Sequence, residues 1–281
     1  DIYTGDIIAM YSSPSYDPNL FLFGISQEEW QLIRNNPLKP LINKTISGLY
    51  SPGSTIKPIV ALSALENNVI DTKFKVKCTG KIELYGQTFH CWKEKGHGWV
   101  SLKNAMKQSC DTYFYEIARL LGVDRLNITA EKFGLGKKVL DQYFDNEKKG
   151  LFPNTKWKKN NLGKGWVLGE TLITGIGQGY TQTTPLQLCM MTAQIANGGY
   201  AIKPKIIVDS NPISYEDAKQ SMESQLLFNS ESKLLGDKKL FKDKKNIKII
   251  QEAMFSSTNE RFGTSYKSRI DDPKYQFAGK T

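Results

Sequence analysis

The chain has 281 residues, of which 40% are hydrophobic and 11% aromatic, so it can bury a large core and is not a disordered protein. Lysine and arginine total 38 against 28 acidic residues. The net charge of +10 favours an anionic partner, such as a phosphate polymer, anionic lipid or an acidic cell-wall polymer, unless it only reflects a solvated surface. No apolar run approaches the roughly 20 residues of a membrane span, and no nucleic-acid-binding motif accompanies the scattered lysines, so nucleic acid is not an expected partner.

Neither end of the chain carries a boundary signal. The sequence opens at Asp1 without a signal peptide and stops at Thr281 in a strand-like stretch, so we expect a fragment of a longer protein. Four cysteines are too few for a disulfide scaffold at this length. Cys189 lies in an apolar helical stretch and is expected in the core.

The first part of the chain predicts a hairpin and two helices. Residues 1–11 alternate around a turn, which is typical of a β-hairpin. The capping box Ser26–Glu29 opens a short helix. The apolar spacing across residues 56–65 predicts a buried helix that begins at Ser54 and ends near Asn67.

The middle of the chain is mainly helical. Residues 78–98 are turn-rich and strand-like, and residues 101–106 predict a short helix. Asp111 is expected to be the N-cap of a helix over residues 112–121, and another helix follows. Residues 146–169 are rich in lysine, glycine, asparagine and tryptophan and predict a loop.

The last part mixes helices with one strand. Residues 175–179 predict a tight backbone passage, and residues 184–195 a helix opened by Thr-Pro. Residues 209–245 are polar and lysine-rich, as in a surface insertion, while residues 247–255 predict a helix. Residues 275–280 predict a strand, and we expect an α+β domain whose sheet joins this strand to the first hairpin.

The start of the Ser54 helix carries the clearest chemistry. Ser54 and Lys57 are three residues apart, so they share one helix face about a turn apart. A neutral lysine could take the hydroxyl proton, and the helix N-terminus favours negative charge on a reacting carbonyl oxygen. Neutrality near pH 7 costs a lysine about 4 kcal/mol, because its free pKa is about 10.4. The hypothesis therefore requires a dry pocket and a second cation nearby.

Three motifs follow one another along the chain, namely Ser54–Lys57, Ser109–Asp111 and Lys280–Thr281. Together they resemble the S-x-x-K, S-D-N and K-T-G motifs of the penicillin-binding proteins and serine β-lactamases. Gly175–Tyr180 and the stretches around the motifs are similar to class B transpeptidases, and Gly96–Gly98 is similar to the elongation-specific penicillin-binding protein 2 group. The resemblance implies a transpeptidase domain over residues 1–281, in which helices flank an antiparallel sheet and form an all-helical lobe.

The resemblance also implies a role for each motif. Ser54 would attack the penultimate carbonyl of a peptidoglycan stem peptide that ends in D-Ala-D-Ala, with Lys57 as the base. Ser109 would relay the proton to the leaving amine, and Asp111 would hold the geometry. In the wider family this last position is usually asparagine. The competing sequence Ser257–Asn259 lacks the apolar helix that follows Asp111.

The third motif would bind the substrate's terminal carboxylate. Lys280 would supply the second cation, and Thr281 would donate a hydrogen bond to the carboxylate. The amide of Ser54 would be one oxyanion donor, and its partner amide is expected beyond Thr281. A chain that ends there is therefore expected to be acylated weakly or not at all, and more slowly than a longer one.

A group of sulfur and nitrogen donors falls within 33 residues of sequence: Cys78, Cys91, His97 and Cys110. Three thiolates and one imidazole are the ligand set of a closed structural zinc site. Core cysteines, or one disulfide with a spare thiol, are the alternatives. His90 competes with His97, although a strand would point it away from Cys91. In the resembled group some members carry zinc here with carboxylates among the ligands, and zinc on Cys110 would fix the second motif.

We therefore expect a peptidoglycan D,D-transpeptidase domain that β-lactams acylate, that acts in cell elongation and shape, and that needs no cofactor for catalysis. A β-lactamase is the nearest alternative, but no motif for a deacylating carboxylate follows Asp111. A D,D-carboxypeptidase and a non-catalytic β-lactam sensor or scaffold stay open. The resemblance implies a membrane glycan polymerase and the elongation machinery as partners. It also implies a place at the periplasmic face of the bacterial inner membrane, with an anchor and a non-catalytic pedestal missing from this chain.

Overall fold

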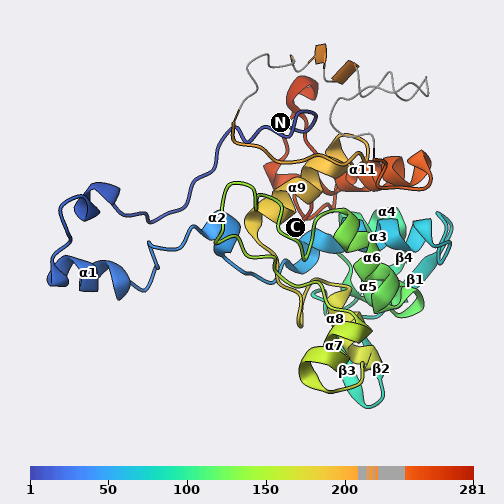
Figure 1. The fold of residues 1–281 in the computed structure, drawn as a ribbon. Helices are drawn as coiled ribbons and strands as arrows, with labels where there is room; N and C mark the ends of the chain where they lie inside the picture. Colours follow the sequence, from blue (N-terminus) through green and yellow to red (C-terminus); the bar gives the residue numbers. More distant parts are fainter. Residues whose placement is uncertain (208–213, 215, 218, 221–237) are drawn as a thin grey trace.

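The structure is a computed structural model that describes residues 1–207, 214, 216–217, 219–220 and 238–281 (Figure 1). Its α-helices are α1 (Gln27–Arg34), α2 (Lys44–Ser47), α3 (Lys57–Glu66), α4 (Leu102–Lys107), α5 (Asp111–Leu121), α6 (Val123–Lys132), α7 (Thr155–Leu162), α8 (Leu168–Thr174), α9 (Pro185–Ala196) and α11 (Lys244–Asn259). Its 3-10 helices are η1 (Pro18–Phe21), η2 (Gly53–Ile56), η3 (Tyr266–Ser268) and η4 (Pro273–Tyr275). Its strands are β1 (Lys75–Cys78), β2 (Lys81–Leu84), β3 (Gln87–His90) and β4 (Gly98–Ser101). Within this part of the chain, no helix has both the length and the apolar character needed to cross a membrane.

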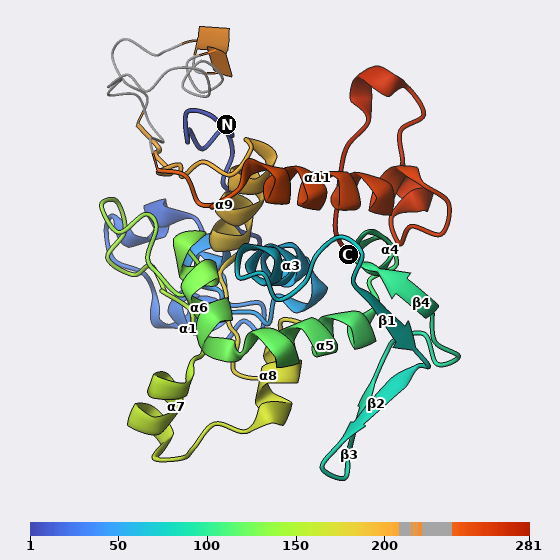
Figure 2. The same ribbon diagram turned by 90° about the vertical axis from the view of Figure 1, so that its right-hand side faces the viewer.

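Helix α3 is the centre of the fold. All of its residues are buried, and because it is apolar on every side it needs packing partners all round. Helices α5, α6 and α11 contact it. Figure 2 shows α3 end-on, with α11 above it and α5 below. The buried helix expected at residues 56–65 is confirmed, although its first turn, which holds Ser54, is the 3-10 helix η2.

Two small antiparallel sheets flank these helices. Strand β1 pairs with β4, with Val76 opposite Val100, and β2 pairs with β3, with Ile82 opposite Phe89. The β2–β3 hairpin extends away from the helices (Figure 2). Helices and small antiparallel sheets together make an α+β fold, and the strand-like, turn-rich reading of residues 78–98 is confirmed.

The sheet expected to join the two chain ends does not form among the described residues. Residues 1–11 form a turn instead of a hairpin, and Asp6 makes an isolated parallel bridge with Lys205. The expected strand at 275–280 is irregular after η4, and the Gly279 amide donates a hydrogen bond to the Met254 carbonyl of α11. A strand needs a partner that pairs with its backbone groups along several residues. Among the described residues, the first segment pairs with Lys205 alone, and residues 275–280 form no bridge.

Helix predictions from local signals are mostly confirmed. The capping box predicted at Ser26 is present, and the helix predicted at residues 184–195 is α9, which also begins with a capping box at Thr184. The prediction of a loop at residues 146–169 is wrong, because these residues contain α7 and the start of α8. These two helices are tied by an ion pair between Lys158 and Glu170 that spacing does not reveal.

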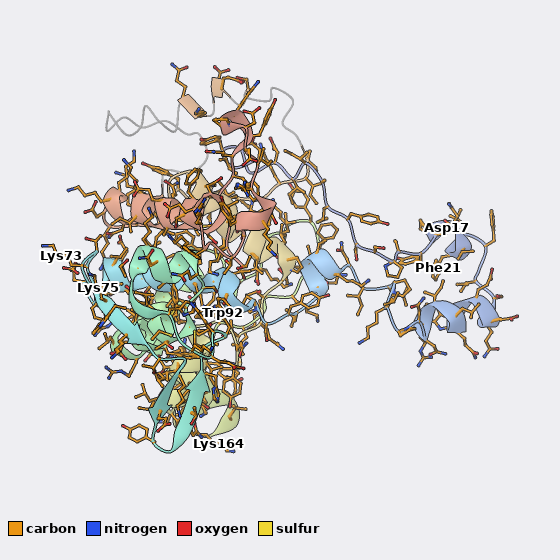
Figure 3. The ribbon with its side chains drawn as sticks, turned by 180° about the vertical axis from the view of Figure 1, so that it is seen from behind. Asp17, Phe21, Lys73, Lys75, Trp92 and Lys164 are labelled. Atoms are coloured by element: carbon orange, nitrogen blue, oxygen red, sulfur yellow. The ribbon has the colours of Figure 1, made fainter. Side chains whose placement is uncertain are left out.

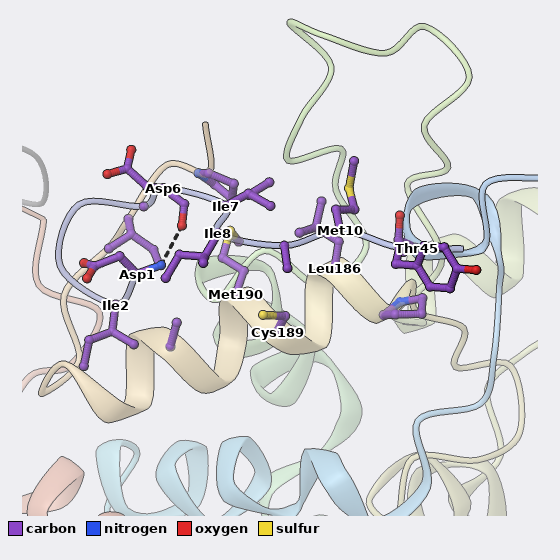
Figure 4. A pocket seen from close by; sticks show the side chains of 17 residues that line it. Asp1, Ile2, Asp6, Ile7, Ile8, Met10, Thr45, Leu186, Cys189 and Met190 are labelled. Atoms are coloured by element: carbon purple, nitrogen blue, oxygen red, sulfur yellow. Dashed lines mark hydrogen bonds between the residues drawn. The ribbon is translucent and has the colours of Figure 1, made fainter. Parts of the chain in front are cut away.

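Cys189 is exposed, so its expected place in the core is also wrong. It lines a cavity of about 450 Å³ between residues 1–11 and α9 (Figure 4), together with Ile7, Leu186 and Met190. The insertion expected at residues 209–245 lies largely outside the described residues.

The segment between residues 11 and 43 projects from the body as an arm (Figures 1 and 3). It carries η1 and α1, and neither of these helices has a buried residue. An edge-to-face contact between Phe21 and Trp30 holds the arm together, while the Phe23 side chain is 99% exposed.

Candidate active site

The loop before α3 places Ser54 at the start of η2. Gly53 has a φ of 57°, in the left-handed region that favours glycine, and its amide donates to the Gly177 carbonyl at 2.9 Å. A Cβ atom at Gly177 would lie 2.2 Å from the Gly53 oxygen, so the tight passage expected at 175–179 requires glycine here. Ser54 is partly buried, and within the described residues its hydroxyl makes no hydrogen bond.

Lys57 lies one turn further on and is fully buried. Its Nζ donates to Asp111 Oδ1 at 2.7 Å, to the Ser109 carbonyl at 3.0 Å and to Ser109 Oγ at 3.2 Å. The same Nζ lies 5.1 Å from the centre of the Phe114 ring. Burial lowers the pKa of Lys57, while the Asp111 carboxylate opposes that shift. The dry surroundings that a basic lysine requires are therefore present.

The second motif lies between α4 and α5. Ser109 has a φ of 52°, which is unusual for a residue other than glycine. The expected N-cap role of Asp111 is wrong, because Cys110 is the N-cap and Asp111 is the first residue of α5. The carboxylate of Asp111 is used instead as the counter-charge of the buried Lys57 ammonium, which would be costly to leave unpaired.

The third motif reaches the same place from the end of the chain. Lys280 Nζ donates to Ser109 Oγ at 2.8 Å, and Ser109 Oγ donates to the Thr281 carbonyl at 3.2 Å. Burial, and next the charge of Lys57, lower the pKa of Lys280 to about 7. The second cation that the sequence analysis required is thus near Lys57. Thr281 Oγ1 donates to Thr264 Oγ1 at 2.6 Å.

The competing second motif does not join this site. Ser257 and Asn259 lie on α11, where Ser257 Oγ is 3.3 Å from Thr264 Oγ1. The Asn259 amide donates to the carbonyls of Phe255 and Phe277. Within the described residues neither side chain is hydrogen-bonded to Lys57, whereas Ser109 and Asp111 are.

Next to the second motif, four possible metal ligands come together: Cys78, Cys91, His97 and Cys110. Their ligand atoms all lie within 4.8 Å of one another, and His97 Nδ1 is 3.5 Å from the sulfur of Cys78 and 3.6 Å from that of Cys91. His90 is exposed and outside this cluster. We call the four residues the Cys–His cluster.

The chemistry of the Cys–His cluster suits zinc. Zn–S bonds of about 2.3 Å in a tetrahedron put the sulfurs about 3.8 Å apart, so a small contraction would complete the site. A hydrogen bond from Cys110 is the main cause that lowers the pKa of Cys91 to about 4 and raises that of Cys110. Burial lowers the pKa of His97, which favours the neutral imidazole that binds metals. All four cysteines of the chain are free thiols.

Two further residues surround the site, and the sequence did not predict either of them. Trp92 donates its backbone N–H to Asp111 Oδ2 at 3.0 Å. Phe114, one turn after Asp111 on α5, covers the Lys57 ammonium. The i, i+3 spacing from Asp111 could have indicated Phe114. For Trp92, the only signal in the sequence was its position next to Cys91.

Comparison with known proteins identifies the family. The family model described as the penicillin binding protein transpeptidase domain matches residues 1–281. Peptidoglycan D,D-transpeptidase MrdA of Acinetobacter baumannii is 36% identical over 284 residues, which cover 100% of this chain and 40% of that protein. MrdA of Escherichia coli K12 is 37% identical over 223 residues, which cover 78% of this chain and 34% of that protein. The chain thus spans less than half the length of these relatives.

Solved structures agree with this result. Pseudomonas aeruginosa PBP2 in complex with WCK 5153 has a TM-score of 0.81 and 39% identity, with 95% of this chain and 55% of that chain covered. Helicobacter pylori PBP2 in complex with MreC has a TM-score of 0.80 and 30% identity, with 96% of this chain and 46% of that chain covered. The fold expected from the resemblance is therefore confirmed. This chain belongs to the family of penicillin-binding protein transpeptidase domains.

Proposed function

We propose that residues 1–281 form the catalytic domain of a serine-type peptidoglycan D,D-transpeptidase of the elongation-specific penicillin-binding protein 2 group. The observation that carries the proposal is the hydrogen-bonded link from Lys57 through Ser109 to Lys280, one turn from Ser54. A hydroxyl, a buried amine, a relay hydroxyl and a second amine are the groups that acyl transfer through serine requires. The proposed substrate is a stem peptide ending in D-Ala-D-Ala, and the similarity to relatives named peptidoglycan D,D-transpeptidase supports it.

In the proposed reaction, the Ser54 hydroxyl attacks the carbonyl carbon of the penultimate D-Ala and its proton passes to neutral Lys57. The peptide C–N bond then breaks, and the terminal D-Ala leaves after Ser109 relays a proton to its nitrogen. An acceptor amine attacks the resulting ester, which frees Ser54 and forms the cross-link. A β-lactam undergoes only the first half of this reaction, the acylation of Ser54, because its opened ring stays attached to the serine.

The electrostatics of the site support this division of roles. As an ammonium, Lys57 uses all three N–H donors on Ser109 and Asp111, so it must lose one proton before it can accept another. Burial lowers the pKa of Lys57 and so favours its neutral form, although the Asp111 carboxylate opposes that shift. The positive charge of Lys57 in turn contributes to the lowered pKa of Lys280. Lys280 and Thr281 would hold the terminal carboxylate of the substrate.

The same proposal extends to partners and location. Relatives occur in a complex of PBP2 with MreC and in a peptidoglycan synthase complex that coordinates polymerization and crosslinking. We propose that the intact protein likewise works with a membrane glycan polymerase and the elongation machinery, at the periplasmic face of the inner membrane. Its role there would be in cell elongation and shape.

The proposed reaction is tested with a stem pentapeptide and an acceptor amine added to the intact protein. We expect D-Ala release and a cross-linked product, both abolished by Ser54→Ala, together with a long-lived penicillin adduct. Rapid hydrolysis of the adduct would instead identify a β-lactamase, and D-Ala release without cross-linking a carboxypeptidase. If Ser54→Ala leaves wall synthesis intact in cells, the protein is a sensor or scaffold.

We also propose that the Cys–His cluster holds one structural zinc ion. Zinc bound there would join the β1–β3 segment to Cys110 and so fix the two neighbouring residues of the second motif. Cys110→Ala should then lower the thermal midpoint and the rate of acylation together, whereas Cys189→Ala, at an exposed thiol, should change neither. Metal analysis that finds no zinc in protein purified without chelators would remove this proposal.

A further inference from the structure

Trp92 donates two N–H groups to the segment that carries the second motif, one from its backbone and one, shared between two acceptors, from its indole. Its backbone N–H donates to Asp111 Oδ2 at 3.0 Å. Its indole Nε1–H lies between two carbonyl oxygens, that of Gln108 at 3.0 Å and that of Ser109 at 3.1 Å. Trp92 lies on the body of the molecule, far from the arm (Figure 3).

These hydrogen bonds stabilise the left-handed backbone conformation of Ser109, which is unfavourable on its own. The left-handed φ of Ser109 is disfavoured for residues with a Cβ atom, and persists only where the surroundings determine it. The Ser109 carbonyl accepts from the indole and also from Lys57 Nζ, which fixes the peptide from two sides. The Asp111 carboxylate is likewise held on both oxygens, by Lys57 and by the Trp92 amide.

Burial alone does not explain a tryptophan at this position. The Trp92 side chain stays 59% exposed, so it contributes less to the core than a buried ring would. Its main contacts are the hydrogen bonds above and an edge-to-face contact with His97, at 5.3 Å between ring centres. One residue therefore links the Cys–His cluster to both ends of the second motif.

We propose that Trp92 is a positioning residue that holds Ser109 in its left-handed conformation, so that the Ser109 hydroxyl stays between Lys57 and Lys280. The role of Ser109 as proton relay belongs to the function proposed above, and the positioning rests on it. Trp92 should affect the rate constant of acylation and not the binding of the substrate, because Trp92 orients the relay hydroxyl of Ser109 and does not supply the nucleophile.

Trp92→Phe tests this role, because it keeps an aromatic ring beside His97 and the backbone N–H while it removes the indole donor. Time-resolved reaction of the intact protein with a fluorescent penicillin separates the dissociation constant before acylation from the acylation rate constant. We expect the rate constant to fall about three- to tenfold, the effect of losing one neutral hydrogen bond, with the dissociation constant within about twofold of wild type.

The matched control is Trp99→Phe. Trp99 is 67% exposed on β4 and makes no side-chain hydrogen bond within the described residues, so its loss should leave both constants unchanged. Metal content and thermal midpoint are measured for both variants. An unchanged rate constant in Trp92→Phe overturns the proposal, and so does a slower rate accompanied by loss of metal or of thermal stability.

Hydrogen exchange provides a readout that does not depend on acylation. The amide of Ser109 donates to Met106, and the amide of Cys110 donates to Ala105. Both amides should exchange faster in Trp92→Phe than in wild type or Trp99→Phe, and unchanged exchange contradicts the positioning role. If wild-type protein is not acylated at all, the proposed function fails and this measurement still decides the role of Trp92.

Discussion

The Lys57 ammonium is fully buried, and within the described residues its carboxylate partner is Asp111 at 2.7 Å. This pair favours the charged lysine, whereas burial favours the neutral one, and burial is the larger effect. The chemistry at Ser54 therefore depends on how far Asp111 offsets the cost of burial. That balance can be changed without changing the volume of either side chain.

Asp111→Asn removes the charge that opposes the lowered pKa of Lys57. The pKa of Lys57 should fall further, so the acidic limb of the acylation rate against pH should move to lower pH. Asp141→Asn, at an exposed position, should leave the limb unchanged. The measurement is the acylation rate between about pH 5 and 9, and a limb that stays in place or moves to higher pH contradicts the assignment of Lys57 as the base.

Lys280 gives a second prediction at this scale. Its folded pKa of about 7 lies below the ordinary value of 10.5, so the unfolded chain binds more protons at this position between these pH values. The free energy of unfolding of wild type, relative to Lys280→Met, should therefore rise as pH increases from about 7 to 10.5. Urea unfolding at pH 6, 8 and 10 measures this difference, and a constant or falling difference is the contrary result.

At the scale of elements, the end of α3 is tied to the start of α11 by one buried carboxylate. Glu66 accepts hydrogen bonds from the amides of Lys242 and Asp243 and from the Asn246 side chain. These donors lie at the entry to α11, whose N-cap is Asp243, so the Glu66 carboxylate lies close to the helix N-terminus, where negative charge is favoured. Through these hydrogen bonds, α11 helps to hold α3, the helix that follows Ser54, in place.

Glu66→Ala leaves those donors without their acceptor and should lower the free energy of unfolding by about 2–4 kcal/mol. The exposed Glu252 of α11 is the control, and Glu252→Ala should change stability by less than about 0.5 kcal/mol. Chemical denaturation measures both variants. Equal stability of the two variants would show that the Glu66 bonds do not tie the helices.

The elements also show what the sequence can predict. Helices α1, α3 and α9 follow from capping boxes and apolar spacing, which are local signals. Helix α7 was missed because Asp124 and Glu170, far from it in sequence, hold its first residue and its buried lysine. The sheet prediction failed for the same reason, because pairing depends on which segments meet in space.

At the scale of the whole molecule, the arm stands out among the described residues because few contacts support it. Its helices have no buried residues, so opening them exposes little apolar surface and costs little free energy. Trypsin should therefore cleave after Arg34 long before it cleaves after the buried Lys158. The nicked protein should keep its thermal midpoint, and early cleavage at Lys158, or loss of the midpoint on nicking, contradicts this account.

The site itself was predicted in part. Three motifs, drawn from positions 54, 109 and 280, were assigned to one site by resemblance, since spacing cannot show that distant segments meet. The Cys–His cluster was predicted from its donor types, but the tie from Trp92 to Asp111 was not, because it uses a backbone N–H that any residue has. The sequence therefore indicated side chains that the structure brings together, but not the contacts that support them.

The most direct measurement is the mass of the intact protein after reaction with penicillin, with the modified peptide sequenced. The account predicts one penicilloyl adduct per chain, on Ser54, formed much more slowly in Lys57→Ala and in Ser109→Ala. An adduct on another residue, or equal rates in the three proteins, would contradict the claim that these distant segments form one catalytic site.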